Sequence, residues 1–166
     1  MSTALSMKAG PTPRPVAILV GTGLLVATVD AIFASTYWHV AAGVPATRIL
    51  QGIAAGLLGK AAFQGGEATA WLGAALHYGM AMVMVLVYYL ASRWMPVLAR
   101  RPWVYGPLYG LVVYAVMNGV VLPLSAAGKQ PHAVAWVVCS VVVHVLVVGV
   151  PSALAARAAR GVSVGG

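Results

Sequence analysis

The chain has 166 residues, of which 61% are hydrophobic and 7% are charged, and its mean hydropathy is +0.93. A soluble domain carries about 25% charged residues, so this composition excludes an ordinary water-soluble domain and predicts a membrane protein. The net charge is +8. The basic residues lie at the ends of apolar runs and not in a patch interleaved with aromatic residues, so nucleic acid is not an expected partner. Cys139 is the one cysteine, which excludes an intrachain disulfide and a thiolate metal cluster.

The chain begins with a polar, proline-containing segment, and we expect residues 1–14 to form a short disordered cytoplasmic tail. The apolar run that follows is longer than the hydrophobic region of a signal peptide, which has about 7–15 residues, and it contains Asp30. About 20 residues cross a hydrocarbon core of about 30 Å. We therefore predict a first membrane-spanning helix over residues 16–37.

The next apolar segment, residues 46–63, is interrupted by Gln51 and Lys60 and is short for a span. This length is typical of an interfacial or re-entrant helix, and both alternatives remain open. Three glycines at helical spacing predict a small-residue face for close packing: Gly52, Gly56 and Gly59.

Three more spanning helices are predicted by the remaining apolar runs, over residues 68–90, 104–124 and 133–156. Pro151 is expected to kink the last of them. The fold class is therefore all-α: a polytopic membrane bundle of four transmembrane helices plus one short helix. Residues 15–160 form its single domain, and residues 161–166 form a flexible tail.

The positions of the lysines and arginines predict the orientation of the chain. If both termini are cytoplasmic, seven basic residues lie on the cytoplasmic side: Lys8, Arg14, Arg93, Arg100, Arg101, Arg157 and Arg160. Three lie on the outer side: Arg48, Lys60 and Lys129. This excess follows the positive-inside rule, so we expect a multi-pass protein of the inner membrane. The aromatic residues Tyr88, Tyr89 and Trp94 are expected to form an interfacial belt.

Only two acidic residues occur, Asp30 and Glu67. A charged residue at membrane depth costs about 3 kcal/mol on insertion scales, so it faces the bundle interior and needs a partner. At 1.5 Å per residue along a helix, Asp30, His77 and Asn118 fall at overlapping depths. A hydrogen bond from Asp30 to His77 or to Asn118 is feasible. Such contacts either fix the helix register or form a titrating or ligand-binding pocket, to which His144 and Glu67 are further candidate contributors.

Two histidines at matched depth on different helices, His77 and His144, are an alternative pair of axial haem ligands, although no cofactor is the primary expectation. At the outer surface, His39, Glu67 and His132 are weak candidates for a divalent metal. Glu67 also suits a helix N-terminus, where its charge meets the helix dipole favourably. No phosphate loop, nucleophile elbow or catalytic carboxylate pair occurs, so an enzyme is not the favoured class.

Two runs of sequence carry a resemblance to known proteins. The first is Pro102-Trp103-Val104-Tyr105-Gly106-Pro107-Leu108-Tyr109-Gly110 with its continuation Val116-Met117-Asn118-Gly119-Val120-Val121-Leu122-Pro123-Leu124-Ser125, and the second leads from His77 to Leu90-Ala91-Ser92-Arg93. Over residues 20–157 the chain resembles uncharacterised small four-helix inner-membrane proteins of bacteria. The resemblance implies a topology and no activity.

Three functional hypotheses follow from the sequence. The first is a membrane-embedded binding or transport component with Asp30, His77 and Asn118 lining a polar pocket. The second is a structural or partner-binding membrane subunit without a ligand, in which these residues only lock the helices. The third is a haem-binding redox membrane protein. The bundle is small for a complete transporter, so we expect a homo-oligomer or a partner membrane protein within the lipid bilayer.

Overall fold

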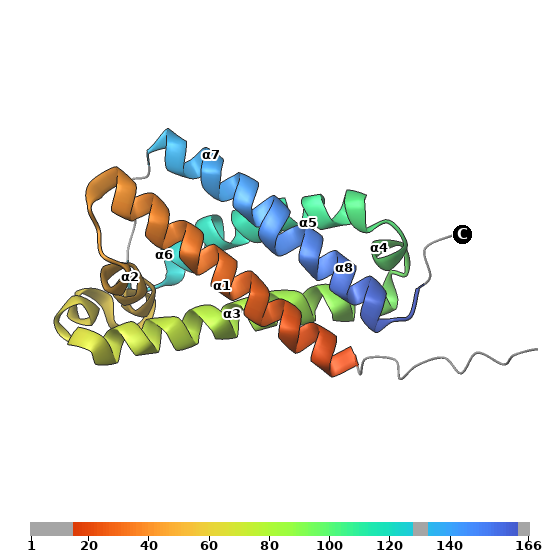
Figure 1. Ribbon diagram of the computed structural model, residues 1–166, viewed down its shortest axis with the longest axis horizontal. Coiled ribbons are helices and arrows are strands. Elements are labelled where there is room, and N and C mark those ends of the chain that lie inside the picture. The colour runs from red at the N-terminus through yellow and green to blue at the C-terminus, as the bar shows by residue number, and fades with distance from the viewer. Residues whose placement is uncertain (1–14, 128–132, 163–166) are drawn as a thin grey trace, which may run out of the picture.

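The computed structural model describes residues 15–127 and 133–162, and every regular element in those ranges is a helix. Four long helices pack against one another along the longest axis of the molecule (Figure 1). The first two are α1 (Pro15–Ala42) and α3 (Gly66–Trp94). The third comprises α5 (Pro102–Val116), the turn Met117–Val121 and α6 (Leu122–Leu124), and the fourth comprises α7 (Val134–Val143), the turn His144–Gly149 and α8 (Val150–Ala159). All four are long and apolar enough to cross a membrane, which confirms the predicted all-α bundle.

The observed long helices cover the first three predicted spans, and the fourth begins at Val134, one residue after its predicted start. α1 extends five residues beyond the predicted end at position 37, and a four-residue helix, α4 (Val97–Arg100), links α3 to α5. The predicted N-terminal tail lies outside the described residues, as does the C-terminal tail from residue 163 onward.

The outside of the bundle is apolar, as a surface that faces lipid must be. Large hydrophobic side chains project outward along the helices; Leu25 is 58% exposed, Ile32 61% and Leu146 59%. A monomeric protein in water rarely exposes so much contiguous apolar surface. The buried core consists instead mainly of small side chains: Val26, Ala27, Ala81, Val85, Val113 and Val148.

The short helix predicted over residues 46–63 is present as α2 (Ala46–Leu58), followed by a 3-10 helix, Gly59–Gln64. Together they lie at the end of the bundle where α3 begins (Figure 1). The prediction that Gly52 forms part of a close-packed glycine face is wrong. No heavy atom of another element lies within 4 Å of the position that a Cβ on Gly52 would take. The close approach is made instead by Gly73 of α3, where a Cβ would lie 1.9 Å from the carbonyl oxygen of Leu50. The partner helix therefore supplies the small residue.

The predicted distortion at Pro151 takes the form of a π-helical turn just before it. Proline has no amide hydrogen, so the carbonyl of Val147 loses its α-helical donor. The preceding amide, on Val150, bonds five residues back to the carbonyl of Val145. The same pattern of bonding precedes Pro123. Each proline thus follows a locally widened turn; the helix continues to Ala159 after Pro151, and it ends at Leu124 after Pro123.

The third and fourth long helices touch backbone to backbone through glycines. A Cβ on Gly110 would lie 2.4 Å from the carbonyl oxygen of His144, and a Cβ on Gly149 would lie 2.1 Å from that of Gly106. Real Cβ atoms essentially never come this close to another atom. These glycines therefore set the spacing of the two helices, in the way that small residues do in membrane bundles.

Candidate functional site

The strongest candidate site is the pair formed by Asp30 on α1 and His77 on α3. The Nε2 atom of His77 lies 3.8 Å from a carboxylate oxygen of Asp30, and it lies 2.9 Å from the carbonyl oxygen of Ala27. The side chains of His77 and Asp30 are 17% and 23% exposed. One histidine nitrogen thus meets both a carbonyl and a carboxylate in the interface of two spanning helices.

The bonding of this nitrogen fixes the tautomer of His77. A backbone carbonyl only accepts hydrogen bonds, so Nε2 carries the hydrogen that is donated to Ala27. The Nδ1 atom of the neutral ring is then a lone-pair acceptor.

A second polar bridge joins the same two helices at the adjacent residues. The hydroxyls of Thr28 and Tyr78 lie 2.9 Å apart. The Thr28 hydroxyl also lies 2.8 Å from the carbonyl oxygen of Leu24, to which it donates. Its single hydrogen is then used, so Tyr78 donates to Thr28. The interface of α1 and α3 at this depth therefore depends on polar side chains as well as on packing.

The candidates Asn118 and His144 belong to a different pair of helices. The Asn118 amide donates to the carbonyl of Tyr114, 3.0 Å away on its own helix. Nδ1 of His144 lies 2.9 Å from the carbonyl of Ser140, also on its own helix, and the rings of His144 and Tyr114 meet edge to face at 5.4 Å. Within the described part of the chain, no hydrogen bond joins Asn118 to Asp30.

Two of the three candidate metal ligands, His39 and Glu67, lie at the end of the bundle where α3 begins. His39 is exposed in the last turn of α1, and Glu67 is exposed in the first turn of α3, the position its charge suits at a helix N-terminus. His132 lies outside the described residues. Residues 15–127 and 133–162 contain no cluster of three His, Cys, Asp or Glu side chains able to hold a metal ion.

An aromatic cluster that the sequence reasoning missed lies on α1 one to two turns beyond Asp30. The Trp136 ring of α7 stacks on Phe33 at 5.7 Å and contacts Tyr37 at 4.9 Å and Trp38 at 5.1 Å. Phe33 and Tyr37 follow Asp30 at helical spacing, so they share its face. The spacing of Phe33 and Tyr37 after Asp30 is the sequence feature from which this cluster could have been predicted. The cluster holds α7 against α1 close to the Asp30–His77 pair.

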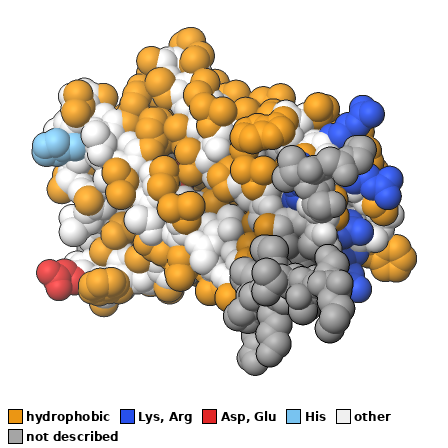
Figure 2. Space-filling view, turned by 45° about the vertical axis from the view of Figure 1, so that its right-hand side comes forward, with side chains coloured by type: hydrophobic (Ala, Val, Ile, Leu, Met, Phe, Trp, Pro, Cys, Tyr) orange, Lys and Arg blue, Asp and Glu red, His pale blue; other side chains and the backbone are white. Residues whose placement is uncertain are grey.

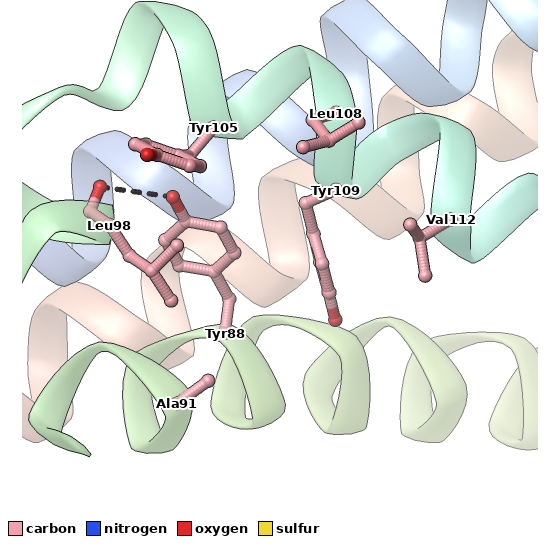
Figure 3. A pocket seen from close by; sticks show the side chains of 7 residues that line it. All are labelled: Tyr88, Ala91, Leu98, Tyr105, Leu108, Tyr109 and Val112. Atoms are coloured by element: carbon pink, nitrogen blue, oxygen red, sulfur yellow. Dashed lines mark hydrogen bonds between the residues drawn. The ribbon is translucent and has the colours of Figure 1, made fainter. Parts of the chain in front are cut away.

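An apolar pocket of about 170 Å³ opens between α3, α4 and α5 (Figure 3). Seven residues line it: Tyr88, Ala91, Leu98, Tyr105, Leu108, Tyr109 and Val112. The hydroxyl of Tyr88 donates to the carbonyl of Leu98 at 3.0 Å, and that of Tyr109 donates to the carbonyl of Met84 at 2.7 Å. With these two hydroxyls bonded to backbone, the pocket suits an apolar group and is not an extension of the polar pair.

This pocket corrects one sequence interpretation. Tyr88 is 2% exposed, so its assignment to an interfacial belt is wrong. Trp94, six residues later, is 89% exposed at the end of α3, as an interfacial tryptophan should be. On a helix, neighbouring residues point about 100° apart, so the adjacent Tyr88 and Tyr89 face different surroundings.

Comparison with known proteins adds no family or function. No protein-family model, no curated protein and no solved structure matches this chain.

Proposed function

We propose that this protein is a small membrane-embedded binding or transport component, and that Asp30 and His77 form its proton-responsive centre. The observation that supports this most is the 3.8 Å approach of the two side chains across the interface of α1 and α3. Asp30 is the one acidic residue placed well inside a long apolar helix. Ionisable residues inside membrane helices are rare, and they mark ion pathways and proton relays.

Both side chains are partly exposed, so a proton or a ligand that reaches this depth of the bundle can contact them. A fully sealed pair would only lock two helices together, because a proton could not reach it. Binding a proton changes the charge of the pair, and in a low-dielectric interior this changes the attraction between α1 and α3 strongly. A change in helix spacing is a step that a transport or binding component needs.

The basic residues support an orientation with both termini in the cytoplasm of a bacterial cell, in the inner membrane. Lys and Arg side chains gather at one end of the molecule (Figure 2). At the end where α3 and α8 finish lie five arginines: Arg93, Arg100, Arg101, Arg157 and Arg160. At the other end of the described bundle lie Arg48 and Lys60. The positive-inside rule assigns the arginine-rich end to the cytoplasm, and the small bundle favours assembly with a second copy or a partner membrane protein.

Infrared difference spectra between acidic and neutral pH test the proton centre on protein in lipid vesicles. We expect a carboxylic-acid band that disappears in Asp30→Asn and shifts in His77→Gln. Glu67→Gln is the matched control, because it removes the other carboxylate and leaves the pair intact. A band that survives in Asp30→Asn and disappears in Glu67→Gln would refute the assignment.

Proton flux into vesicles loaded with a pH-sensitive dye tests the transport part of the proposal. We expect a flux above that of empty vesicles, and its loss in Asp30→Asn while Glu67→Gln retains it. Equal flux in vesicles with and without the protein would refute the transport part of the proposal. The protein would then be a binding component that takes up a proton and does not transport it.

A structural or partner-binding subunit without a ligand is the second candidate, and one observation favours it. Within the described residues, every buried side-chain nitrogen and oxygen has a hydrogen-bond partner, as expected of contacts that only fix helix register. In that case Asp30→Asn and His77→Gln lower the unfolding temperature and no proton flux is present in the parent protein.

Haem binding through His77 and His144 stays a third hypothesis. Ligation through Nε2 of His77 would require its bond to the Ala27 carbonyl to break. A Soret band in the absorbance spectrum of the purified protein, lost in both His77→Gln and His144→Gln, would establish it.

A further inference from the structure

A basic cavity lies at the arginine-rich end of the bundle, away from the Asp30–His77 pair. It has a volume of about 290 Å³ and is lined by Tyr89, Arg93 and Arg160. Tyr89 and Arg93 are one turn apart near the end of α3, and Arg160 directly follows α8. Two cationic side chains and a phenol thus converge on one space from two spanning helices.

The position of Arg160 has a local cause in the sequence of α3. Residue 96 is proline, which has no amide hydrogen, so the carbonyl of Ser92 lacks the donor that would continue a helix. The Arg160 guanidinium donates to this carbonyl through one of its terminal nitrogens. A guanidinium has five N–H donors in a rigid plane, so this bond orients Arg160 and leaves further donors for a ligand in the cavity.

Neither acidic residue of the sequence lies where it could balance the positive charge of this cavity. The sequence has two acidic residues, Asp30 and Glu67. Glu67 is at the opposite end of the helix that carries Arg93, about 39 Å away at 1.5 Å per residue. Within the described ranges, Arg93 has no hydrogen-bond or ion-pair partner. The cavity therefore suits an external anion.

The depth of the cavity selects the kind of anion. Trp94 follows Arg93 directly and is 89% exposed, and an exposed tryptophan at the end of a spanning helix marks the level of the lipid headgroups. Lipid phosphates lie at this level. Arginine binds phosphate oxygens with charge-assisted, often bidentate hydrogen bonds, and basic pockets between membrane helices on the cytoplasmic side bind anionic headgroups.

We propose that Tyr89, Arg93 and Arg160 form a binding site for the phosphate headgroup of an anionic phospholipid. The Arg93 and Arg160 guanidiniums bind the phosphate oxygens, and the Tyr89 hydroxyl donates a further hydrogen bond. The site is independent of proton binding at Asp30, so either assignment can fail without the other.

Native mass spectrometry of the protein in mild detergent, with added phosphatidylglycerol or phosphatidylcholine, tests this site. We expect retention of phosphatidylglycerol in preference to phosphatidylcholine, and about a tenfold loss of that retention in Arg93→Gln, the effect of removing one hydrogen bond to a charged group. Arg93→Gln is the primary variant because Arg93, unlike Arg160, is not needed to satisfy a backbone carbonyl. Arg100→Gln is the matched control, because it removes the same charge at the same end without lining the cavity.

Equal loss of phosphatidylglycerol in Arg93→Gln and Arg100→Gln would overturn the site in favour of general surface charge. No preference for phosphatidylglycerol over phosphatidylcholine would also overturn it. Thermal stabilisation by inorganic phosphate alone, equal to that by phosphatidylglycerol and lost in Arg93→Gln, would assign the cavity to a free phosphate and refute the lipid.

Discussion

Substitution of Gly149 by alanine should separate the third and fourth long helices. The added Cβ would lie 2.1 Å from the carbonyl oxygen of Gly106 and 2.8 Å from the amide nitrogen of Gly110. Both of these atoms are backbone, so neither can turn away as a flexible side chain would. Ordinary contact begins at 3.4 Å, so the two backbones must move apart by about 1.3 Å, the difference between the two distances.

The magnitude follows from this displacement. A gap of about 0.5–1 Å already removes a quarter to a half of the dispersion attraction between contacting atoms, and overpacking of this kind costs about 1–3 kcal/mol. Alanine gains about 0.5–1 kcal/mol over glycine in helix propensity, which offsets part of that cost. We therefore expect Gly149→Ala to lower the free energy of unfolding by about 1–2 kcal/mol, the net of these two contributions.

Gly79→Ala in α3 is the control, since no heavy atom of another element lies within 4 Å of its Cβ position. It should leave stability unchanged or raise it by a few tenths to about 1 kcal/mol. The assay is unfolding in mixed detergent micelles, followed by tryptophan fluorescence. If Gly149→Ala were as stable as Gly79→Ala, the backbone contact would not set the helix spacing and the reasoning would be refuted.

Three further substitutions test other parts of the bundle. Tyr109→Phe removes the donor to the carbonyl of Met84 and should destabilise the protein by about 1 kcal/mol, measured by the same unfolding assay. Trp136→Leu removes three ring contacts between α1 and α7 and should cost about 2 kcal/mol; an unchanged unfolding free energy would show that the aromatic cluster does not hold α7. Pro151→Ala restores an amide donor for the carbonyl of Val147, so we expect the amide at position 151 to become protected from hydrogen exchange, and an exchange rate like that of a free amide would contradict the π-turn explanation.

The spanning helices could be predicted from the sequence because hydrocarbon imposes a simple rule on composition. A chain that crosses a membrane must satisfy all its backbone hydrogen bonds internally, so a long apolar run forms a helix whatever its neighbours are. The approach of Asp30 to His77 could also be predicted from the sequence. The rise per residue of a helix gives the depth of each residue in the membrane. A carboxylate is energetically unfavourable inside the membrane, so it needs a polar partner at its own depth.

The contacts that determine the spacing between helices could not be predicted from the sequence in this way. The close approach at Gly73 depends on the backbone of Leu50, and hydropathy does not say which helix lies opposite a glycine. Gly106 and Gly110 do carry the four-residue spacing of small residues typical of close helix pairs, but their partner, Gly149, is far away in the sequence. The burial of Tyr88 likewise follows from α4 folding back over it, which puts the Leu98 carbonyl within reach of its hydroxyl.

The interface of the third and fourth long helices and the interface of α1 and α3 are stabilised by different interactions. This difference determines which of the two interfaces can change its spacing. Between the third and fourth long helices the backbones touch at Gly110 and Gly149. Moving these two helices apart would lose van der Waals contacts, and no change of charge at this contact would compensate for that loss. Between α1 and α3 the contacts at the depth of Asp30 include polar side chains: the approach of His77 to Asp30 and the hydrogen bond between Thr28 and Tyr78. Under the proposed function, proton uptake by the Asp30–His77 pair acts on the interface of α1 and α3, and the two helices packed through glycines keep their spacing.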